Sequence, residues 1–242
     1  EALSRDCPEN QIALSRAGAI PPLVVLLGSG SDTTQRYAQG ALLNVAMPNN
    51  DNRNAVVKAL VALLEVRNAA AQMKSAESLS ILASRSMPNR SAIAAAGAIP
   101  PLVRLLGDGR NVNKAQIRAA TALSDLARSG ENKQAIMSAG GIEPLVQMLA
   151  SSSSEAQARA AAALDHLSAS TSAQSRIADA GGIELLVALL SSERIVAANH
   201  AACALYNLGS TKSNKEVMLK AGTIAPFVAL LNRTDSAEVQ DA

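Results

Sequence analysis

The sequence predicts an all-helical solenoid with three helices in each repeat of about 41 residues. The first observation is a phrase, Ala-Gly-x-Ile followed by an apolar run, that begins at Ala17, Ala96, Ala139, Ala180 and Ala221. The steps between these alanines are 79, 43, 41 and 41 residues, so the first step contains one further repeat of different form. The second observation is that apolar residues make up 48% of the chain but aromatic residues only 1%. Such a core must consist of closely packed Ala and Leu side chains, which suits short distances between helices.

The first helix of each repeat is expected to begin at an asparagine, seven residues before the leading alanine or its counterpart Ala59. These residues are Asn10, Asn52, Asn89, Asn132 and Asn214, and one repeat carries Ala173 instead. Because Asn is a favourable helix N-cap, we expect these side chains to cap the first helices. The glycine that follows each leading alanine allows the positive φ that ends a helix. The next proline fits the first turn of the second helix.

The second and third helices are predicted from their apolar spacing. The second helix carries Leu-Val-x-Leu-Leu at 23–27 and 102–106, and a polar stretch such as 151–154 separates it from the third helix. The third helix has the template Gln-x-x-Ala-x-x-Ala-Leu-x-Asn-Leu, whose apolar positions recur at helical spacing. Residues 35–45, 116–126 and 157–167 follow this template.

The second repeat is atypical. Residues 52–59 match a first helix and residues 60–64 match a second helix, but the five residues Gly-x-Ile-x-Pro between them are missing. With no glycine to reverse the chain, we expect Val56 to Val66 to form one continuous helix. A local change in the curvature of the solenoid should accompany it.

We expect one array over residues 1–242. Its parts are the end of a preceding repeat at 1–9, repeats at 10–51, 52–88, 89–131, 132–172 and 173–213, and a truncated repeat at 214–242. Residues 2–5 are similar to the end of a third helix, and residues 238–242 are similar to the start of one. No polar capping repeat is visible at either end, so we expect the chain to be part of a longer protein.

Three helices per repeat, with the signatures Ala-Gly-x-Ile-Pro and Ala-Leu-x-Asn-Leu, resemble the armadillo repeat over essentially the whole chain. Residues 34–45 are most similar to arrays in plant-type U-box ubiquitin ligases and vacuolar armadillo scaffolds. The resemblance implies a right-handed superhelix in which the third helices line a concave groove. In that groove an asparagine ladder holds an extended peptide by its main chain. A HEAT array is the alternative, but it lacks the short first helix and its glycine turn.

The ladder maps onto Asn44, Ile81, Asp125, His166 and Asn207, so only its first and last positions keep the asparagine. Four residues before each ladder position, nuclear-import receptors of the importin-alpha type carry a tryptophan. Here these positions hold Gly40, Glu77, Thr121, Ala162 and Cys203, and the chain has no tryptophan at all. The chain is therefore not a typical importin alpha, and we do not expect it to bind a nuclear localisation signal in that manner.

The positions seven residues before the ladder carry most of the cations of the predicted groove. They hold Tyr37, Lys74, Arg118, Arg159 and His200, and Arg128 joins them three residues after Asp125. A basic stripe on a chain of net charge +2 favours an acidic peptide or protein segment. The alternative is that these are ordinary solvated charges on a helix face. The candidate groove residues are Asn44, Lys74, Arg118, Asp125, Arg128, Arg159, His166, His200 and Asn207.

Other functions find little support in the sequence. It has no nucleophile elbow, phosphate loop or zinc-ligand spacing, so we expect no enzyme activity, no metal and no cofactor. One Phe and two Tyr offer no stacking platform for nucleic acid. No apolar run approaches the length of a membrane span, so we expect no direct membrane insertion. Cys7 and Cys203 stand in distant repeats, which predicts reduced thiols in an intracellular, cytoplasmic protein, with a nuclear location left open.

The sequence therefore predicts a non-catalytic adaptor or scaffold that binds an extended, acidic peptide or protein segment in its concave groove. Two alternatives remain open. The array could be the substrate-recognition arm of a larger ubiquitin ligase, or a structural component of a large cytoskeletal or ciliary assembly.

Overall fold

The computed structural model describes residues 2–5, 7–107, 109 and 112–238. All regular secondary structure in these residues is helical. They form two compact units, and each is described by itself. Unit 1 comprises Glu1–Leu106 with Asn113–Ala139, and unit 2 comprises Gly107–Val112 with Gly140–Ala242.

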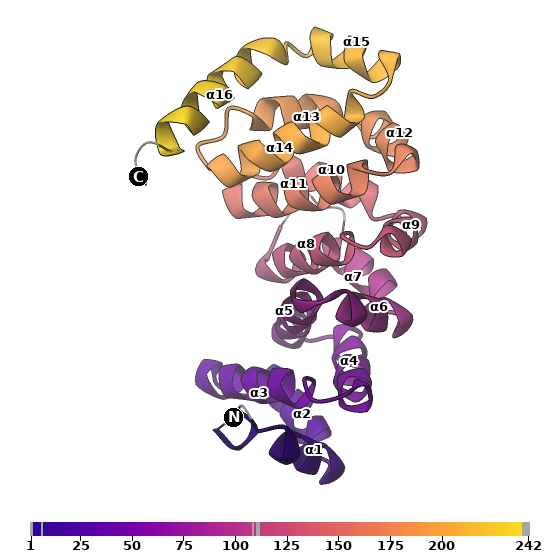
Figure 1. Cartoon of the computed structure of the whole chain (residues 1–242), viewed down its shortest axis with the longest axis vertical. Helices are drawn as coiled ribbons and strands as arrows, with labels where there is room; N and C mark the ends of the chain where they lie inside the picture. The colour runs from indigo at the N-terminus through magenta and orange to yellow at the C-terminus, as the bar shows by residue number, and fades with distance from the viewer. Residues whose placement is uncertain (1, 6, 108, 110–111, 239–242) are drawn as a thin grey trace. The chain divides into compact units, whose positions relative to one another are not determined.

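Unit 1 repeats the order of a first, a second and a third helix. Its elements are η1 (Ala2–Ser4), α1 (Pro8–Arg16), α2 (Ile20–Ser29), α3 (Asp32–Val45), α4 (Asn50–Leu64), α5 (Ala69–Arg85), α6 (Met87–Ala95), α7 (Ile99–Leu106), α8 (Lys114–Leu126) and α9 (Gly130–Ser138). The third helices α3, α5 and α8 lie on one side of the unit, and α4, α6 and α9 lie on the other (Figure 1). α5 packs along both α3 and α8, so the third helices form a continuous row within the unit.

Unit 2 continues the same order. Its helices are α10 (Ile142–Leu149), α11 (Ser154–Ser168), α12 (Thr171–Asp179), α13 (Gly182–Leu189), α14 (Ile195–Leu208), α15 (Lys212–Lys220) and α16 (Ile224–Glu238). The third helices α11 and α14 pack against each other, and each also packs against the second helix that precedes it. The predicted helix start at 238–242 lies outside the described residues except for Glu238, which belongs to α16.

The predicted glycine turns are confirmed. The glycines between first and second helices all have φ between 73° and 79°; they are Gly18, Gly97, Gly140, Gly181 and Gly222. At the turn after α6, the backbone N–H of Gly97 donates to the carbonyl of Ala94 at 2.9 Å, and that of Ala98 donates to the carbonyl of Ile93 at 3.3 Å. Left-handed backbone is costly for residues with a Cβ, which explains why glycine stands at each of these turns.

The continuous helix predicted for the atypical repeat is also confirmed. α4 runs unbroken over Asn50–Leu64 and ends two residues before the predicted limit. Val56, Val57 and Leu60 are fully buried in the middle of this helix, where other repeats have their glycine turn. The expected change in curvature at this repeat stays a prediction.

The expectation that the recurring asparagines cap the first helices is wrong. The N-caps lie three residues earlier, where the side chains of Asn49, Ser86 and Thr211 accept a hydrogen bond from a backbone N–H. The donors of these bonds are the backbone amides of Asn52, Asn89 and Asn214, so the asparagines lie inside the first turn. Their side chains remain available for another partner.

That partner is a carbonyl at the end of the preceding third helix. The Nδ2 atoms donate from Asn52 to Val45 at 3.1 Å, from Asn89 to Leu82 at 2.7 Å, from Asn132 to Leu126 at 3.1 Å and from Asn214 to Leu208 at 2.8 Å. The last carbonyls of a helix have no partner within the helix, so each asparagine satisfies one of them. In two repeats the asparagine does not make this bond, because Asn10 is exposed and Ala173 replaces the other asparagine. There the next residue donates the hydrogen bond instead. Gln11 donates to Ser4, and Gln174 donates to Ser168.

The glutamine that opens the third-helix template has the same role one helix later. The Nε2 atoms donate to carbonyls near the end of the preceding helix: Gln35 to Gly30 at 3.0 Å, Gln72 to Leu64 at 3.0 Å, Gln116 to Leu106 at 2.6 Å and Gln157 to Leu149 at 3.2 Å. Amide side chains therefore connect successive helices in the repeats at two places, and this explains why the template keeps Gln at a buried or half-buried position.

The core consists of Ala and Leu, as predicted. The leucine at the Ala-Leu position of the template, which is Ser-Leu in α5, has no exposed surface in any of the five third helices; these residues are Leu42, Leu79, Leu123, Leu164 and Leu205. Each buried leucine contributes about 1.5–3 kcal/mol relative to an exposed one. No single described helix is long and apolar enough to cross a membrane, although α1 and α2 pass the same test as a pair bent by 87°.

Candidate functional site

The ladder positions lie on α3, α5 and α8 of unit 1 and on α11 and α14 of unit 2. Both ladder asparagines are half-buried and donate from Nδ2 to a serine hydroxyl at the end of the preceding third-helix segment. Asn44 reaches Ser4 at 3.4 Å, and Asn207 reaches Ser168 at 2.9 Å. Within the described residues neither Oδ1 atom accepts a hydrogen bond.

Asp125, the central ladder position, is engaged within unit 1. The Ser80 hydroxyl on α5 donates to its Oδ2 atom at 2.7 Å. Ser80 stands one residue before Ile81, the ladder position of its own helix. This contact connects α5 to α8 and holds the carboxylate of Asp125 in place.

A second set of polar contacts, here named the Glu77 cluster, joins α3, α5 and α8. Its members are Gln39, Lys74, Glu77, Ser78 and Arg118. Glu77 Oε2 lies 3.2 Å from Lys74 Nζ and 3.3 Å from Gln39 Nε2, and Glu77 Oε1 lies 3.8 Å from Arg118 Nε. Ser78 accepts from the same Gln39 amide at 3.1 Å. Two predicted groove cations, Lys74 and Arg118, are thus brought together by a carboxylate.

In unit 2, a titratable set named here the Asp165 cluster lies on α11 and α14. Its members are Asp165, His166, His200 and Cys203. His200 Nδ1 lies 2.9 Å from Asp165 Oδ2, and the rings of His166 and His200 are 6.4 Å apart between centroids. Burial, followed by the negative charge of Asp165, raises the pKa of the Cys203 thiol above its ordinary value of 9.0. Across the described residues, no three His, Cys, Asp or Glu side chains converge to hold a metal ion.

Arg128 and Arg159 differ from the other predicted cations. Both are exposed, and neither makes a hydrogen bond or ion pair to a residue that the structure describes. The predicted groove cations and histidines therefore fall into three groups: Lys74 and Arg118 are held by Glu77, His200 is held by Asp165 with the ring of His166 nearby, and Arg128 and Arg159 are exposed. The carboxylates Glu77, Asp125 and Asp165 all have partners inside the protein.

The sequence analysis gave no role to Gln39, Ser80, Asp165 or Ser168, and it placed Glu77 at a groove position without assigning it a contact. A signal for some of them was present. Ser80 and Asp165 each stand one residue before a ladder position, and in both units that position contacts the next third helix. Glu77 stands three residues after Lys74, which is the spacing of an ion pair on one helix.

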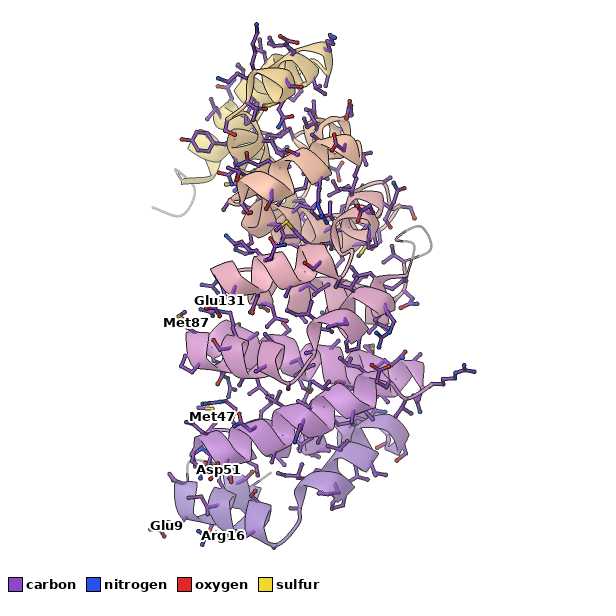
Figure 2. The ribbon with its side chains drawn as sticks, turned by 90° about the vertical axis from the view of Figure 1, so that its right-hand side faces the viewer. Glu9, Arg16, Met47, Asp51, Met87 and Glu131 are labelled. Atoms are coloured by element: carbon purple, nitrogen blue, oxygen red, sulfur yellow. The ribbon has the colours of Figure 1, made fainter. Side chains whose placement is uncertain are left out.

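A different exposed surface runs along the turns from third to first helices of unit 1. Figure 2 shows Met47, Asp51, Met87 and Glu131 along this edge, here named the turn edge. The two methionine side chains are 55% and 62% exposed, and Arg85 Nη1 lies 3.0 Å from Met47 Sδ. The turn edge carries acidic side chains in the first turns of α4 and α9, where their negative charge interacts favourably with the positive end of the helix dipole.

An open pocket of about 500 Å³ lies on the first-helix side of unit 1, between α4 and α6. Its floor is formed by alanine side chains, including Ala55, Ala92 and Ala95, and Asn54 and Lys58 are its only polar lining residues. The pocket forms because the alanine side chains on the facing surfaces of α4 and α6 are too small to fill the space between the two helices.

These helices and turns define an α-helical repeat protein in which successive third helices present polar side chains. The sequence matches the armadillo/beta-catenin-like repeat family over residues 7–47, 131–169 and 173–210. No curated protein matches the chain.

Solved structures resemble the chain over most of its length. An engineered protein is 30% identical with a TM-score of 0.75, and the match covers 88% of this chain and 90% of that one. A designed armadillo repeat protein is 27% identical with a TM-score of 0.67, covering 86% and 89%. Another, in complex with the peptide (KR)4, is 26% identical with a TM-score of 0.66, again covering 86% and 89%.

The chain therefore belongs to the armadillo-repeat family. The predicted all-helical armadillo fold is confirmed, and with it the general role of a protein-binding scaffold. Armadillo repeats are typically non-catalytic, which agrees with the absence of an enzyme motif in the sequence.

Proposed function

We propose that this chain is a non-catalytic scaffold that binds an extended acidic peptide or protein segment along its third helices. The observation that carries the proposal is that the carboxylates of this surface have partners within the protein, whereas two of its arginines have none among the described residues. Glu77, Asp125 and Asp165 are each held by internal donors, whereas Arg128 and Arg159 are exposed and unpaired among the described residues. The charge that remains for a partner on this surface is therefore positive.

The ladder asparagines support binding of a main chain. Their Oδ1 atoms can accept hydrogen bonds from the N–H groups of an extended peptide. The designed armadillo repeat protein in complex with the peptide (KR)4 supports binding of a peptide by this repeat architecture. Its ligand is basic, so the charge preference of an armadillo protein has to come from its own side chains rather than from the fold.

The proposal is tested by titrating the chain with three fluorescent peptides, (Glu-Ala)4, (Gln-Ala)4 and (Lys-Arg)4, by anisotropy. We expect the acidic peptide to bind most tightly and its affinity to fall with added salt, because exposed charges are screened. A triple variant, Lys74→Glu with Arg118→Glu and Arg159→Glu, should lose this preference.

A matched variant reverses three exposed cations on first helices, Arg16→Glu with Lys58→Glu and Lys215→Glu. It has the same net charge as the triple variant, so a general charge effect would weaken binding equally in both. We expect this control to keep most of the affinity. Equal binding of the acidic and neutral peptides by the wild-type chain, or equal losses in the two variants, would contradict the proposal.

The sequence left two alternatives open, a recognition arm of a ubiquitin ligase and a structural component of a large assembly. No contact among the described residues favours either of them over the proposed function. A cytoplasmic location remains part of our proposal and is supported by the two cysteines, which are both free thiols.

A further inference from the structure

The carboxylate of Glu77 lies between cations that come from two neighbouring third helices. Lys74 of α5 approaches one of its oxygens and Arg118 of α8 approaches the other, at 3.2 Å and 3.8 Å. We infer that Glu77 is an internal competitor, which occupies the place that a carboxylate of the acidic partner takes on binding. This inference rests on the proposed function and assigns the specificity-determining residue of that surface.

The geometry of the Glu77 cluster suits recognition of a carboxylate. Gln39 of α3 donates to the same oxygen as Lys74, and its amide is fixed by the Ser78 hydroxyl, which itself donates to a backbone carbonyl. Donors from three successive third helices therefore point at a single carboxylate before any ligand arrives. Pre-organised donors of this kind lower the cost of binding, because no side chain has to be ordered afterwards.

The cluster is also within reach of a partner. The side chains of Lys74, Glu77 and Arg118 are 19%, 27% and 35% exposed, so they are neither sealed in the core nor fully solvated. Glu77 occupies the donors of Lys74 and Arg118 that face it, and each of these donors can also donate to a carboxylate of a ligand. A carboxylate of the ligand can take over these donors when the Glu77 side chain turns away toward solvent.

Displacement of Glu77 has a consequence for selectivity. A neutral ligand offers nothing in exchange for the internal ion pairs, so it is disfavoured at this position. An acidic ligand restores them, but its net gain is reduced by the contacts that Glu77 loses. Removal of the Glu77 charge should therefore strengthen binding of an acidic peptide, which is the opposite of what loss of a ligand-binding residue would do.

The test compares Glu77→Gln with Glu131→Gln, an equal change of charge at an exposed acid on the turn edge. Affinities for (Glu-Ala)4 and (Lys-Arg)4 are measured for wild type and both variants at one salt concentration. We expect Glu77→Gln to bind the acidic peptide about three- to tenfold more tightly, as close charge pairs at interfaces allow. Glu131→Gln should stay within about twofold of wild type, because its carboxylate lies away from the cluster.

Two results would overturn the inference while leaving the proposed function in place. One is a wild type that prefers the acidic peptide together with a Glu77→Gln variant that binds it equally or more weakly. The other is a gain that persists when Lys74→Gln is added to Glu77→Gln, since the gain must come from the released cations. If wild type shows no preference for the acidic peptide, the proposed function fails and this inference with it. Circular dichroism on each variant confirms equal helicity before affinities are compared.

Discussion

Asn89→Ala tests the role that the structure gives to the recurring asparagines. Asn89 lies in the first turn of α6, is 8% exposed and donates from Nδ2 to the Leu82 carbonyl at 2.7 Å. Leu82 is itself only 1% exposed, so water cannot easily replace the lost donor. Asn10, the equivalent residue of α1, is exposed, and its neighbour Gln11 makes the corresponding bond.

The size of the stability loss follows from the Leu82 carbonyl, which has no side-chain donor after the substitution. A buried acceptor left without a donor costs about 1–3 kcal/mol, and the small cavity adds to this. We therefore expect Asn89→Ala to lower the free energy of unfolding by about 2 kcal/mol. Asn10→Ala removes no buried hydrogen bond and should change it by less than about 0.5 kcal/mol.

Urea denaturation followed by circular dichroism measures both variants against wild type. An N-cap role at this position would predict similar losses of about 1 kcal/mol at Asn89 and Asn10. Equal effects at the two sites would therefore refute the structural reasoning. Ser86→Ala, at the actual N-cap of α6, supplies the reference for a capping loss.

Two further substitutions test the glycine turns and the environment of Cys203. Gly97 has φ +79° with open space around its Cβ position, so Gly97→Ala should lower the free energy of unfolding by about 1 kcal/mol from backbone strain alone. Gly130→Ala, at the start of α9, should be neutral or stabilising in the same urea denaturation experiment, and equal losses in the two variants would contradict this reasoning. Burial and Asp165 raise the pKa of the Cys203 thiol, so less thiolate is present at pH 8 than in a solvated cysteine. In a Cys7→Ser background, Asp165→Asn should lower that pKa and speed alkylation by iodoacetamide at pH 8, with the difference shrinking at higher pH; unchanged rates would contradict the assigned cause.

The helices of this fold were predictable because their signals are local. A glycine with positive φ marks each reversal of the chain between a first and a second helix, and a proline follows it within four residues at every one except Gly181. The loss of this glycine from the second repeat predicts the unbroken α4. The asparagine row was misassigned because Asn is also a good N-cap. The actual caps, such as Asn49, Ser86 and Thr211, form their own row three residues earlier, which was readable in the sequence.

The polar surface was less predictable because it depends on which side chains meet across helices. Lys74 and Arg118 stand more than forty residues apart, and only the packing of α5 against α8 places both beside Glu77. In the same way, the packing of α14 against α11 brings His200, a predicted groove residue, within hydrogen-bond distance of Asp165. The spacing of residues along one helix predicts which side chains share a face, but it does not predict which charged side chains on adjacent helices pair with each other.

The most direct test of the central claim is an NMR titration of the isotope-labelled chain with the (Glu-Ala)4 peptide. We expect amide shift changes on α5, α8, α11 and α14, together with the side-chain amide of Asn207 and the guanidinium signals of Arg128 and Arg159. Shift changes confined to first helices such as α4 and α6, or none at saturating peptide, would contradict the account that the third helices bind an acidic segment.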